Sequence, residues 1–134
     1  MKLNISCIRD SLLYLEEWLV LTDNLEYQSL SLEEICQGGS MLKYSLPELA
    51  YTLTKMEEAG FINATIEFAN DSIDFLEISS ITYAGHQFLD SIRPESTWNK
   101  IHSISEKTGL KSVSAIMEIA NILLPETIKS VLHS

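Results

Sequence analysis

Seven side chains between Lys43 and Lys55 have types and spacing suited to contacts with nucleic acid. They are Lys43, Tyr44, Ser45, Glu48, Tyr51, Thr52 and Lys55. Ammonium groups neutralise phosphates, and the hydroxyl groups of Ser, Thr and Tyr hydrogen-bond to phosphate oxygens. In DNA-binding helix pairs, exposed residues near the start of the second helix face the base edges. We therefore predict a nucleic-acid-binding helix that begins at Ser45, with Lys43 and Tyr44 in the turn before it.

The charge around this candidate surface opposes the same function. Good DNA-binding surfaces neutralise about six to ten phosphates, whereas this one offers two lysines with Glu48 and Glu58 beside them. Between Met56 and Ile92 the chain has seven acidic residues and neither Lys nor Arg. A polyanion would meet an uncompensated negative surface along that stretch.

Other chemistry is poorly represented in the sequence. His86, His102 and His133 are scattered, and no His and Cys residues have the spacing of a metal site. No nucleophile-elbow, phosphate-binding or dinucleotide-binding motif occurs. Cys7 and Cys36 are predicted to be two buried thiols of a cytoplasmic protein. We expect no catalytic residue, no metal and no cofactor, and thus a protein that is not an enzyme.

Hydrophobic periodicity predicts the elements that would position the candidate helix. They are a helix over 5–21, a short strand over 27–30, a brief helix over 32–37 stopped at 38–39, a helix from 45 to 60, two strands over 61–68 and 73–81, and a helix from 82 to 92. Ser31 with Glu34, Ser45 and Thr82 are the predicted helix caps. The order predicts a mostly helical α+β fold, a winged helix-turn-helix with a β-hairpin wing, over residues 1–93.

Residues 94–134 are predicted as a C-terminal extension of two helices, over about 95–108 and 112–132. Pro125 is expected to kink or break the second helix, which carries a wide apolar band that must be covered. The band could fold back over the first helix of the chain, or it could pair with a second copy in a symmetric dimer. The candidate dimer interface is Val113, Ile116, Met117, Ala120, Leu123 and Leu124.

Four segments of the chain carry a family resemblance. They are CIRDSLLYLEEWL (7–19), LPELAYTLTKMEEAGFI (46–62), ITYAGHQFLDSIR (81–93) and the W-x-K-I of residues 98–101. Together they resemble the domain of unknown function 2513 family, a set of small bacterial and prophage-associated proteins. The strongest match is I-T-x-x-G-H-x-F-L-D-x-I-R. The resemblance implies a winged-helix fold, but it implies no activity and no ligand or catalytic residue.

Composition leaves two functions open. Of the formal net charge of −10, all lies on residues 1–93, and no apolar run is long enough for a membrane span. We expect either a winged-helix protein of regulatory type that binds DNA as a dimer, or an acidic protein–protein interaction module on the same scaffold. A strong negative field would steer association with a basic partner protein in the second case.

Overall fold

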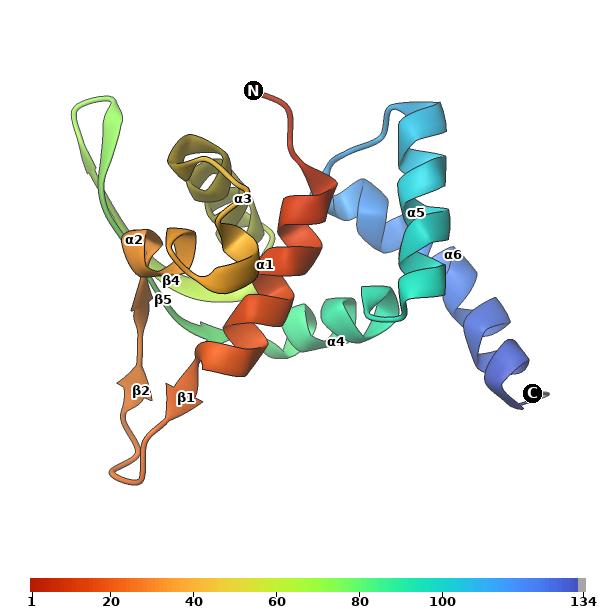
Figure 1. The fold of residues 1–134 in the computed structure, drawn as a ribbon, viewed down its shortest axis with the longest axis horizontal. Helices are drawn as coiled ribbons and strands as arrows, with labels where there is room; N and C mark the ends of the chain where they lie inside the picture. The colour runs from red at the N-terminus through yellow and green to blue at the C-terminus, as the bar shows by residue number, and fades with distance from the viewer. Residues whose placement is uncertain (133–134) are drawn as a thin grey trace.

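The computed structural model describes the backbone of residues 1–132 and, except over 124–131, their side chains. Within this range the fold is α+β, with six α-helices and two small antiparallel sheets (Figure 1). The elements are α1 (Ile5–Trp18), β1 (Val20–Leu21), β2 (Tyr27–Gln28), β3 (Leu30–Ser31), α2 (Leu32–Cys36), the 3-10 turn η1 (Gly39–Met41), α3 (Leu46–Glu58), β4 (Ile62–Ala69), β5 (Ser72–Ile81), α4 (Tyr83–Ile92), α5 (Glu95–Thr108) and α6 (Val113–Leu132).

Side-chain caps fix where three of the helices begin, as the sequence predicts. Ser31 and Glu34 form a reciprocal capping box at α2. The Ser45 hydroxyl accepts the Glu48 N–H at 3.2 Å at the start of α3, and the Thr82 hydroxyl accepts the N–H of residue 85 at 3.0 Å at the start of α4. Each cap satisfies a backbone donor that has no partner within its own helix.

The segment after α1 differs from the prediction. Helix α1 ends at Trp18 instead of residue 21, because Val20–Leu21 pairs with Tyr27–Gln28 as a separate hairpin. Its turn is closed by a hydrogen bond from the Thr22 N–H to the Glu26 carbonyl at 2.8 Å. The single strand predicted over 27–30 is two strands, since β2 pairs with β1 while β3 pairs with β5. The pairing of β1 with β2 here overrides the helical periodicity.

The larger sheet has the strand order β3-β5-β4, with β5 in the centre. Strand β4 pairs with β5 from Ile62 opposite Ile81 to Ala69 opposite Ser72. The far end of this β4–β5 hairpin projects away from the body of the molecule (Figure 1). Ile62, Leu76 and Ile78 toward its base are buried, whereas Phe68 near its tip is 64% exposed. The hairpin therefore contributes to the core only through its base.

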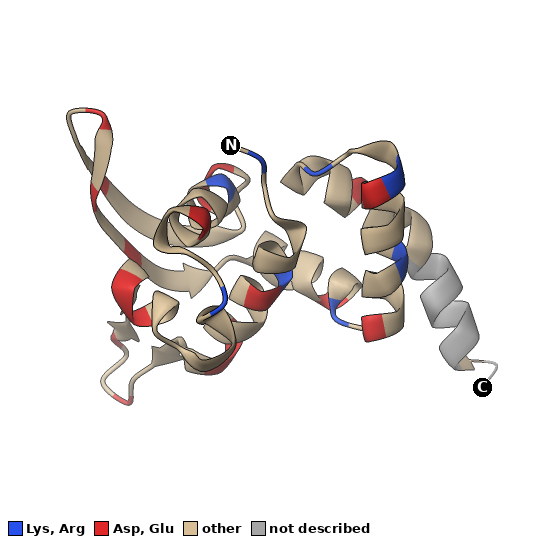
Figure 2. Cartoon of the chain, turned by 45° about the horizontal axis from the view of Figure 1, so that its top comes forward, with Lys and Arg blue, Asp and Glu red and all other residues tan. Residues whose placement is uncertain are grey.

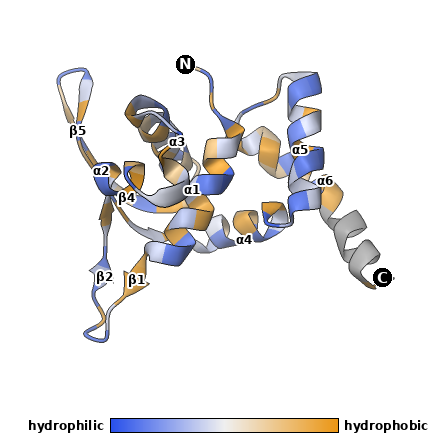
Figure 3. Ribbon diagram, in the orientation of Figure 1, coloured by the Kyte–Doolittle hydropathy of each residue, from blue (hydrophilic) through white to orange (hydrophobic). Residues whose placement is uncertain are grey.

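One hydrophobic core joins the helices to the base of the sheet. Helix α1 contributes Ile8, Leu12 and Leu15, all with no exposed surface. Helices α3 and α4 and strand β5 pack around α1. Hydrophobic and hydrophilic residues alternate along the helices (Figure 3). The predicted C-terminal extension belongs to the same core, since Trp98 and Ile101 of α5 are buried in it.

Helix α6 packs chiefly against α4 and α5. Within the apolar band, Val113 is 5% exposed, and Ile116 and Ala120 are fully buried in their own chain. Met117 and Leu123 are partly buried against the core. These candidate dimer residues are thus covered, wholly or in part, within the monomer, and the side chain of the sixth, Leu124, lies outside the described residues.

Of the kink or break predicted at Pro125, the break is wrong, because α6 runs from Val113 to Leu132 without interruption. A proline removes one backbone hydrogen bond from the ladder of a helix. In α6 that loss does not end the helix.

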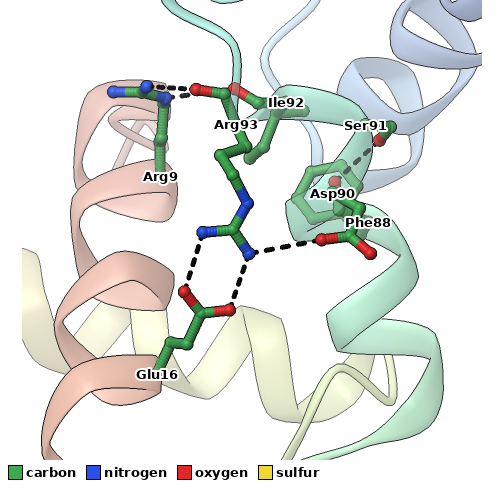
Figure 4. Close-up of polar contacts among 7 residues, drawn as sticks. All are labelled: Arg9, Glu16, Phe88, Asp90, Ser91, Ile92 and Arg93. Atoms are coloured by element: carbon green, nitrogen blue, oxygen red, sulfur yellow. Dashed lines mark hydrogen bonds and ion pairs between the residues drawn. The ribbon is translucent and has the colours of Figure 1, made fainter.

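Two arginines hold α1 against the end of α4 (Figure 4). Arg9 donates from Nε to the Ile92 carbonyl at 3.1 Å and from Nη2 to the Arg93 carbonyl at 2.6 Å. Its guanidinium also lies 5.8 Å from the centre of the Trp98 ring. Arg93 reaches back to Glu16 with two hydrogen bonds of 2.7 and 2.6 Å. This contact with Arg93 lowers the pKa of Glu16, so the ion pair persists at neutral pH and is lost as pH falls through that lowered pKa.

The two arginines should differ in their effect on stability. Replacing Arg9 with Met is expected to lower the free energy of unfolding by about 1–3 kcal/mol, because two half-buried carbonyls lose their donors. Replacing Arg93 with Met should cost at most about 1 kcal/mol, since its ion pairs are solvent-exposed. Urea denaturation of both variants measures the difference, and an equal or larger loss for Arg93→Met would contradict this assignment.

Candidate nucleic-acid interface

Helix α3 presents Tyr51 and Lys55 on the side opposite its buried face. Its buried residues include Leu49, Leu53 and Met56. The Lys55 Nζ lies 5.5 Å from the centre of the Tyr51 ring and 3.0 Å from Glu58 Oε2. Both side chains are partly exposed. They are the two predicted contact residues that remain available to a ligand on the exposed face of this helix.

Two of the predicted contact residues are buried, which corrects the sequence-based assignment. Thr52 has no exposed surface, and its hydroxyl donates to the Glu48 carbonyl at 2.9 Å. It follows Tyr51 by about 100° around the helix, which turns it toward the core. Tyr44 is only 7% exposed, and its hydroxyl donates to Asp10 Oδ2 at 2.6 Å. Neither hydroxyl can contact a phosphate without leaving its place.

Lys43 is exposed, but a carboxylate of the same chain compensates its charge. Its Nζ lies 3.1 Å from Asp10 Oδ2, the oxygen that also accepts the Tyr44 hydroxyl. Burial, together with this hydrogen bond to Asp10, raises the pKa of Tyr44 well above its ordinary value. Asp10 thus anchors the turn before α3 to helix α1.

This arrangement predicts a specific loss of stability at high pH. The pKa of Tyr44 is raised in the folded state, whereas an unfolded tyrosine has a pKa of about 10. The stability that the protonated Tyr44 contributes is therefore complete below about pH 10 and is lost as pH rises above that value. The free energy of unfolding should fall by up to about 1.4 kcal/mol for each further pH unit. Between pH 8 and 11, the urea midpoint of Tyr44→Phe should fall less steeply with rising pH than that of the parent protein. The exposed Tyr27→Phe is the control, and an unchanged slope in Tyr44→Phe would refute the prediction.

The two remaining predicted residues serve to position the helix and the chain beside it. The Ser45 hydroxyl is engaged as the cap of α3. Glu48 Oε1 accepts a hydrogen bond from Asn4 Nδ2 at 3.2 Å, and the Asn4 side chain also caps α1. This contact places the first residues of the chain next to α3, where Lys2 lies near Lys55.

A cleft of about 500 Å³ separates α3 from the start of α6. We call it the basic cleft, and it is lined by Lys2, Leu3, Tyr51, Lys55, Gly109, Lys111, Ser112 and Val113. Its three lysines come from the N-terminal segment, from α3 and from the α5–α6 connection. Figure 2 shows basic positions on all three segments, while acidic positions mark the β4–β5 hairpin and α2.

Local backbone features bring the third lysine into the cleft. Gly109 ends α5 in the left-handed conformation, with φ 75°, which glycine adopts at little cost. The chain then turns so that Lys111 and Ser112 face α3 across the cleft. The Ser112 hydroxyl accepts the Ala115 N–H at 3.1 Å in the first turn of α6. The partial positive charge of this helix N-terminus adds to that of the lysines.

The cleft gathers three ammonium groups in a chain with a net charge of −10, and two of them are paired with carboxylates, as Lys43 is with Asp10. Lys55 is paired with Glu58, and Lys111 lies 3.2 Å from Glu106. Lys2 makes no ion pair within the part of the chain that the structure describes. Such a set of ammonium groups beside a tyrosine hydroxyl suits the binding of phosphate oxygens.

Sequence reasoning missed Lys2, Lys111 and Ser112 as members of this site. Lys2 and Lys111 lie more than fifty residues from Lys55 in opposite directions along the chain. No local pattern links them, because the hydrogen bond between Asn4 and Glu48 and the packing of α5 and α6 bring them together. The one relevant feature of the sequence is its small number of Lys and Arg residues, because three of them in one place are then unusual.

Among the described residues, no group of three or more His, Cys, Asp or Glu side chains could hold a metal ion. Cys7 and Cys36 are both free thiols, and burial raises the pKa of Cys7 so that it stays protonated at neutral pH. No helix within the described residues is long and apolar enough to cross a membrane.

Comparison with known proteins gives one match. A family model described as "Hypothetical protein (DUF2513)" matches residues 2–111, which span every lysine of the basic cleft. Neither the curated proteins nor the solved structures give a match to this chain.

Proposed function

The chain belongs to the DUF2513 family, and we propose that it is a winged-helix protein of regulatory type that binds DNA at the basic cleft beside α3. The order of elements supports this. Helix α1 is followed by the β1–β2 hairpin, the short strand β3, helix α2, the turn η1, helix α3 and the long β4–β5 hairpin, and β3 adds to the hairpin strand β5. This is the arrangement in which a winged-helix domain presents its second paired helix, here α3, to the major groove.

One observation carries the proposal, namely the gathering of Lys2, Lys55 and Lys111 around the exposed side of α3. Each ammonium can neutralise a phosphate, and Tyr51 can donate a hydrogen bond between them. The acidic β4–β5 hairpin supplies no such group. We therefore place the DNA backbone across α3 and the start of α6, and not along the hairpin.

The proposal predicts a particular dependence on salt. Lys55→Gln with Lys111→Gln should weaken binding to a mixed-sequence 20-base-pair duplex at least tenfold at 50 mM salt, a loss of about 1.4 kcal/mol. The slope of log K against log salt concentration should fall by about two, one for each phosphate contact removed. Fluorescence anisotropy of a labelled duplex, titrated at several salt concentrations, measures both quantities.

A control of equal charge separates the cleft from net charge. Lys100→Gln with Lys107→Gln removes two exposed lysines of α5 that do not line the cleft. This variant should bind DNA nearly as well as the parent protein and keep its salt slope. Equal weakening by the two double variants would refute the cleft as the binding site.

The acidic interaction module is the alternative function. Complete absence of DNA binding at 50 mM salt, by a chain whose circular dichroism shows that it is folded, would favour the module over DNA binding. Sedimentation over a range of concentrations tests the dimer, since two copies would present two basic clefts to one duplex. A monomer at all concentrations would limit each molecule to one cleft.

A further inference from the structure

A second groove, of about 470 Å³, lies between the β1–β2 hairpin and the end of β5 with the start of α4. We call it the hairpin groove. One wall comes from residues between 15 and 27, and the other from residues between 63 and 86. The β1–β2 hairpin lies at the bottom of Figure 1, whereas the N-terminal segment and the α5–α6 connection lie at the top. The hairpin groove is thus separate from the basic cleft.

Large apolar side chains line this groove while remaining exposed. Val20 is 45% exposed, Leu21 is 54%, Tyr27 is 62% and Tyr83 is 79%. Strand β1 is correspondingly hydrophobic in Figure 3. Single exposed apolar residues are ordinary, but a group of them around one concave surface is typical of a site for a partner. The groove therefore has the hydrophobic component of a binding site.

The segments that form the groove carry acidic residues and no Lys or Arg, although His86 also lines the groove. Residues 10–42 and 56–92, which supply both walls, contain seven acidic residues each and neither Lys nor Arg. Glu16 lies in the wall, and Glu17, Asp23 and Glu26 follow on the same segment as exposed residues. Arg93 reaches Glu16, but its guanidinium is bound by Glu16 and Asp90 together. The lining of the groove is mixed, with exposed apolar side chains beside polar ones. We call the exposed Glu17, Asp23 and Glu26 of the segment that forms one wall the acidic rim. Carboxylates next to exposed apolar side chains are complementary to a basic and apolar ligand.

A strand edge also faces this region. Strand β3 pairs with β5 only through Leu30 opposite Ile78 and Ser31 opposite Glu77. On the other side of β5, β4 continues to pair as far as Ile81. Among the described residues, no strand pairs with β5 over 79–81 on the β3 side, although β2 contacts β5 there, and residues 79–81 line the groove. An extended peptide can add to such an edge by backbone hydrogen bonds.

We infer that the hairpin groove binds an extended segment of a partner protein in which basic and apolar side chains alternate. Alternate side chains of a strand point to opposite faces, so apolar ones would enter the groove while basic ones meet the carboxylates of the rim. A second copy of this chain is a poorer occupant, because two identical acidic rims would repel each other. The inference does not depend on DNA binding, which involves other residues.

A set of synthetic peptides tests the inference. The probe is a fluorescein-labelled ten-residue peptide in which Lys alternates with Val. Its binding to the full chain is measured by fluorescence anisotropy. It should bind at least tenfold more tightly than a peptide alternating Glu with Val, or one alternating Lys with Ser. Equal binding of the Lys–Val and Lys–Ser peptides would mean that charge alone acts, and would overturn the proposal.

Protein variants locate the site. Tyr27→Ser with Tyr83→Ser should weaken binding of the Lys–Val peptide at least tenfold. The matched control is Phe68→Ser with Phe75→Ser, which removes two exposed aromatic rings from the β4–β5 hairpin and should leave binding unchanged. Loss of binding in the control alone, or equally in both variants, would refute the hairpin groove as the site.

Two further measurements test strand addition and the choice of occupant. Peptides N-methylated at every even or every odd position lose backbone donors on one edge only, so one of the two should bind much more weakly than the other. Equal affinities would exclude strand addition. Sedimentation that shows a dimer abolished by Tyr27→Ser with Tyr83→Ser would assign the groove to a second copy and overturn the proposal.

Discussion

Replacing Gly85 with alanine is expected to lower the free energy of unfolding by about 3 kcal/mol, among the largest effects of any single methyl group in this protein. Gly85 lies in the first turn of α4 and is buried. An added Cβ would fall on the carbonyl oxygen of Phe61 and 2.7 Å from Ile81 Cγ2. The Phe61 carbonyl cannot easily retreat, because it accepts the Thr82 N–H at 3.0 Å.

Urea denaturation followed by circular dichroism measures this effect against a neighbouring control. Ala84 is exposed in the same turn of α4, so Ala84→Gly changes one methyl group without touching the core and should cost about 1 kcal/mol. If Gly85→Ala is no more destabilising than Ala84→Gly, the close approach of α4 to the backbone of Phe61 is not required for folding. The glycine of the T-x-x-G segment would then have no packing role.

Replacing Ile116 with alanine is expected to lower the free energy of unfolding by about 3 kcal/mol, because the side chain has no exposed surface in the monomer. The loss combines the transfer of apolar atoms with the cavity left between α6 and its neighbours α4 and α5. Thermal or urea denaturation measures the change, and sedimentation should give the same oligomeric state for variant and parent.

Ile122 provides the control on the same helix. It is 74% exposed, so Ile122→Ala should change stability by less than about 0.5 kcal/mol. A small effect of Ile116→Ala together with dissociation of a dimer would show that the apolar band is covered by a second copy in solution. A large effect without change of oligomeric state would support its burial within one chain.

The two proposed surfaces differ in charge, since the basic cleft carries lysines and the hairpin groove lies beside acidic residues. The basic cleft is suited to phosphates, and the hairpin groove is suited to a basic and apolar protein segment. A chain that holds DNA on one side and a partner protein on another would connect the two, which is the arrangement a regulator needs. Because the surfaces share no residue, variants of one should leave binding at the other unchanged.

The local elements were predictable because their signals act over three or four residues. The caps at Ser31, Ser45 and Thr82 each involve a side chain and a backbone N–H within one turn of helix. The β4–β5 hairpin likewise follows from short-range alternation and a turn at Asn70, whose φ of 58° suits asparagine. In contrast, the end of α1 was misplaced, since the pairing of β1 with β2 competes with helical propensity.

Most of the helices, the β4–β5 hairpin and the two long stretches without Lys or Arg can be read from the sequence, because each of these is a property of neighbouring residues. Which residues face solvent, and which charges meet, depends on the packed fold. It buried Tyr44 and Thr52, and it brought Lys2 and Lys111 to Lys55 from distant parts of the chain. The physical reason is that burial and charge clustering depend on how elements pack against one another, and a few buried contacts between distant residues set that packing.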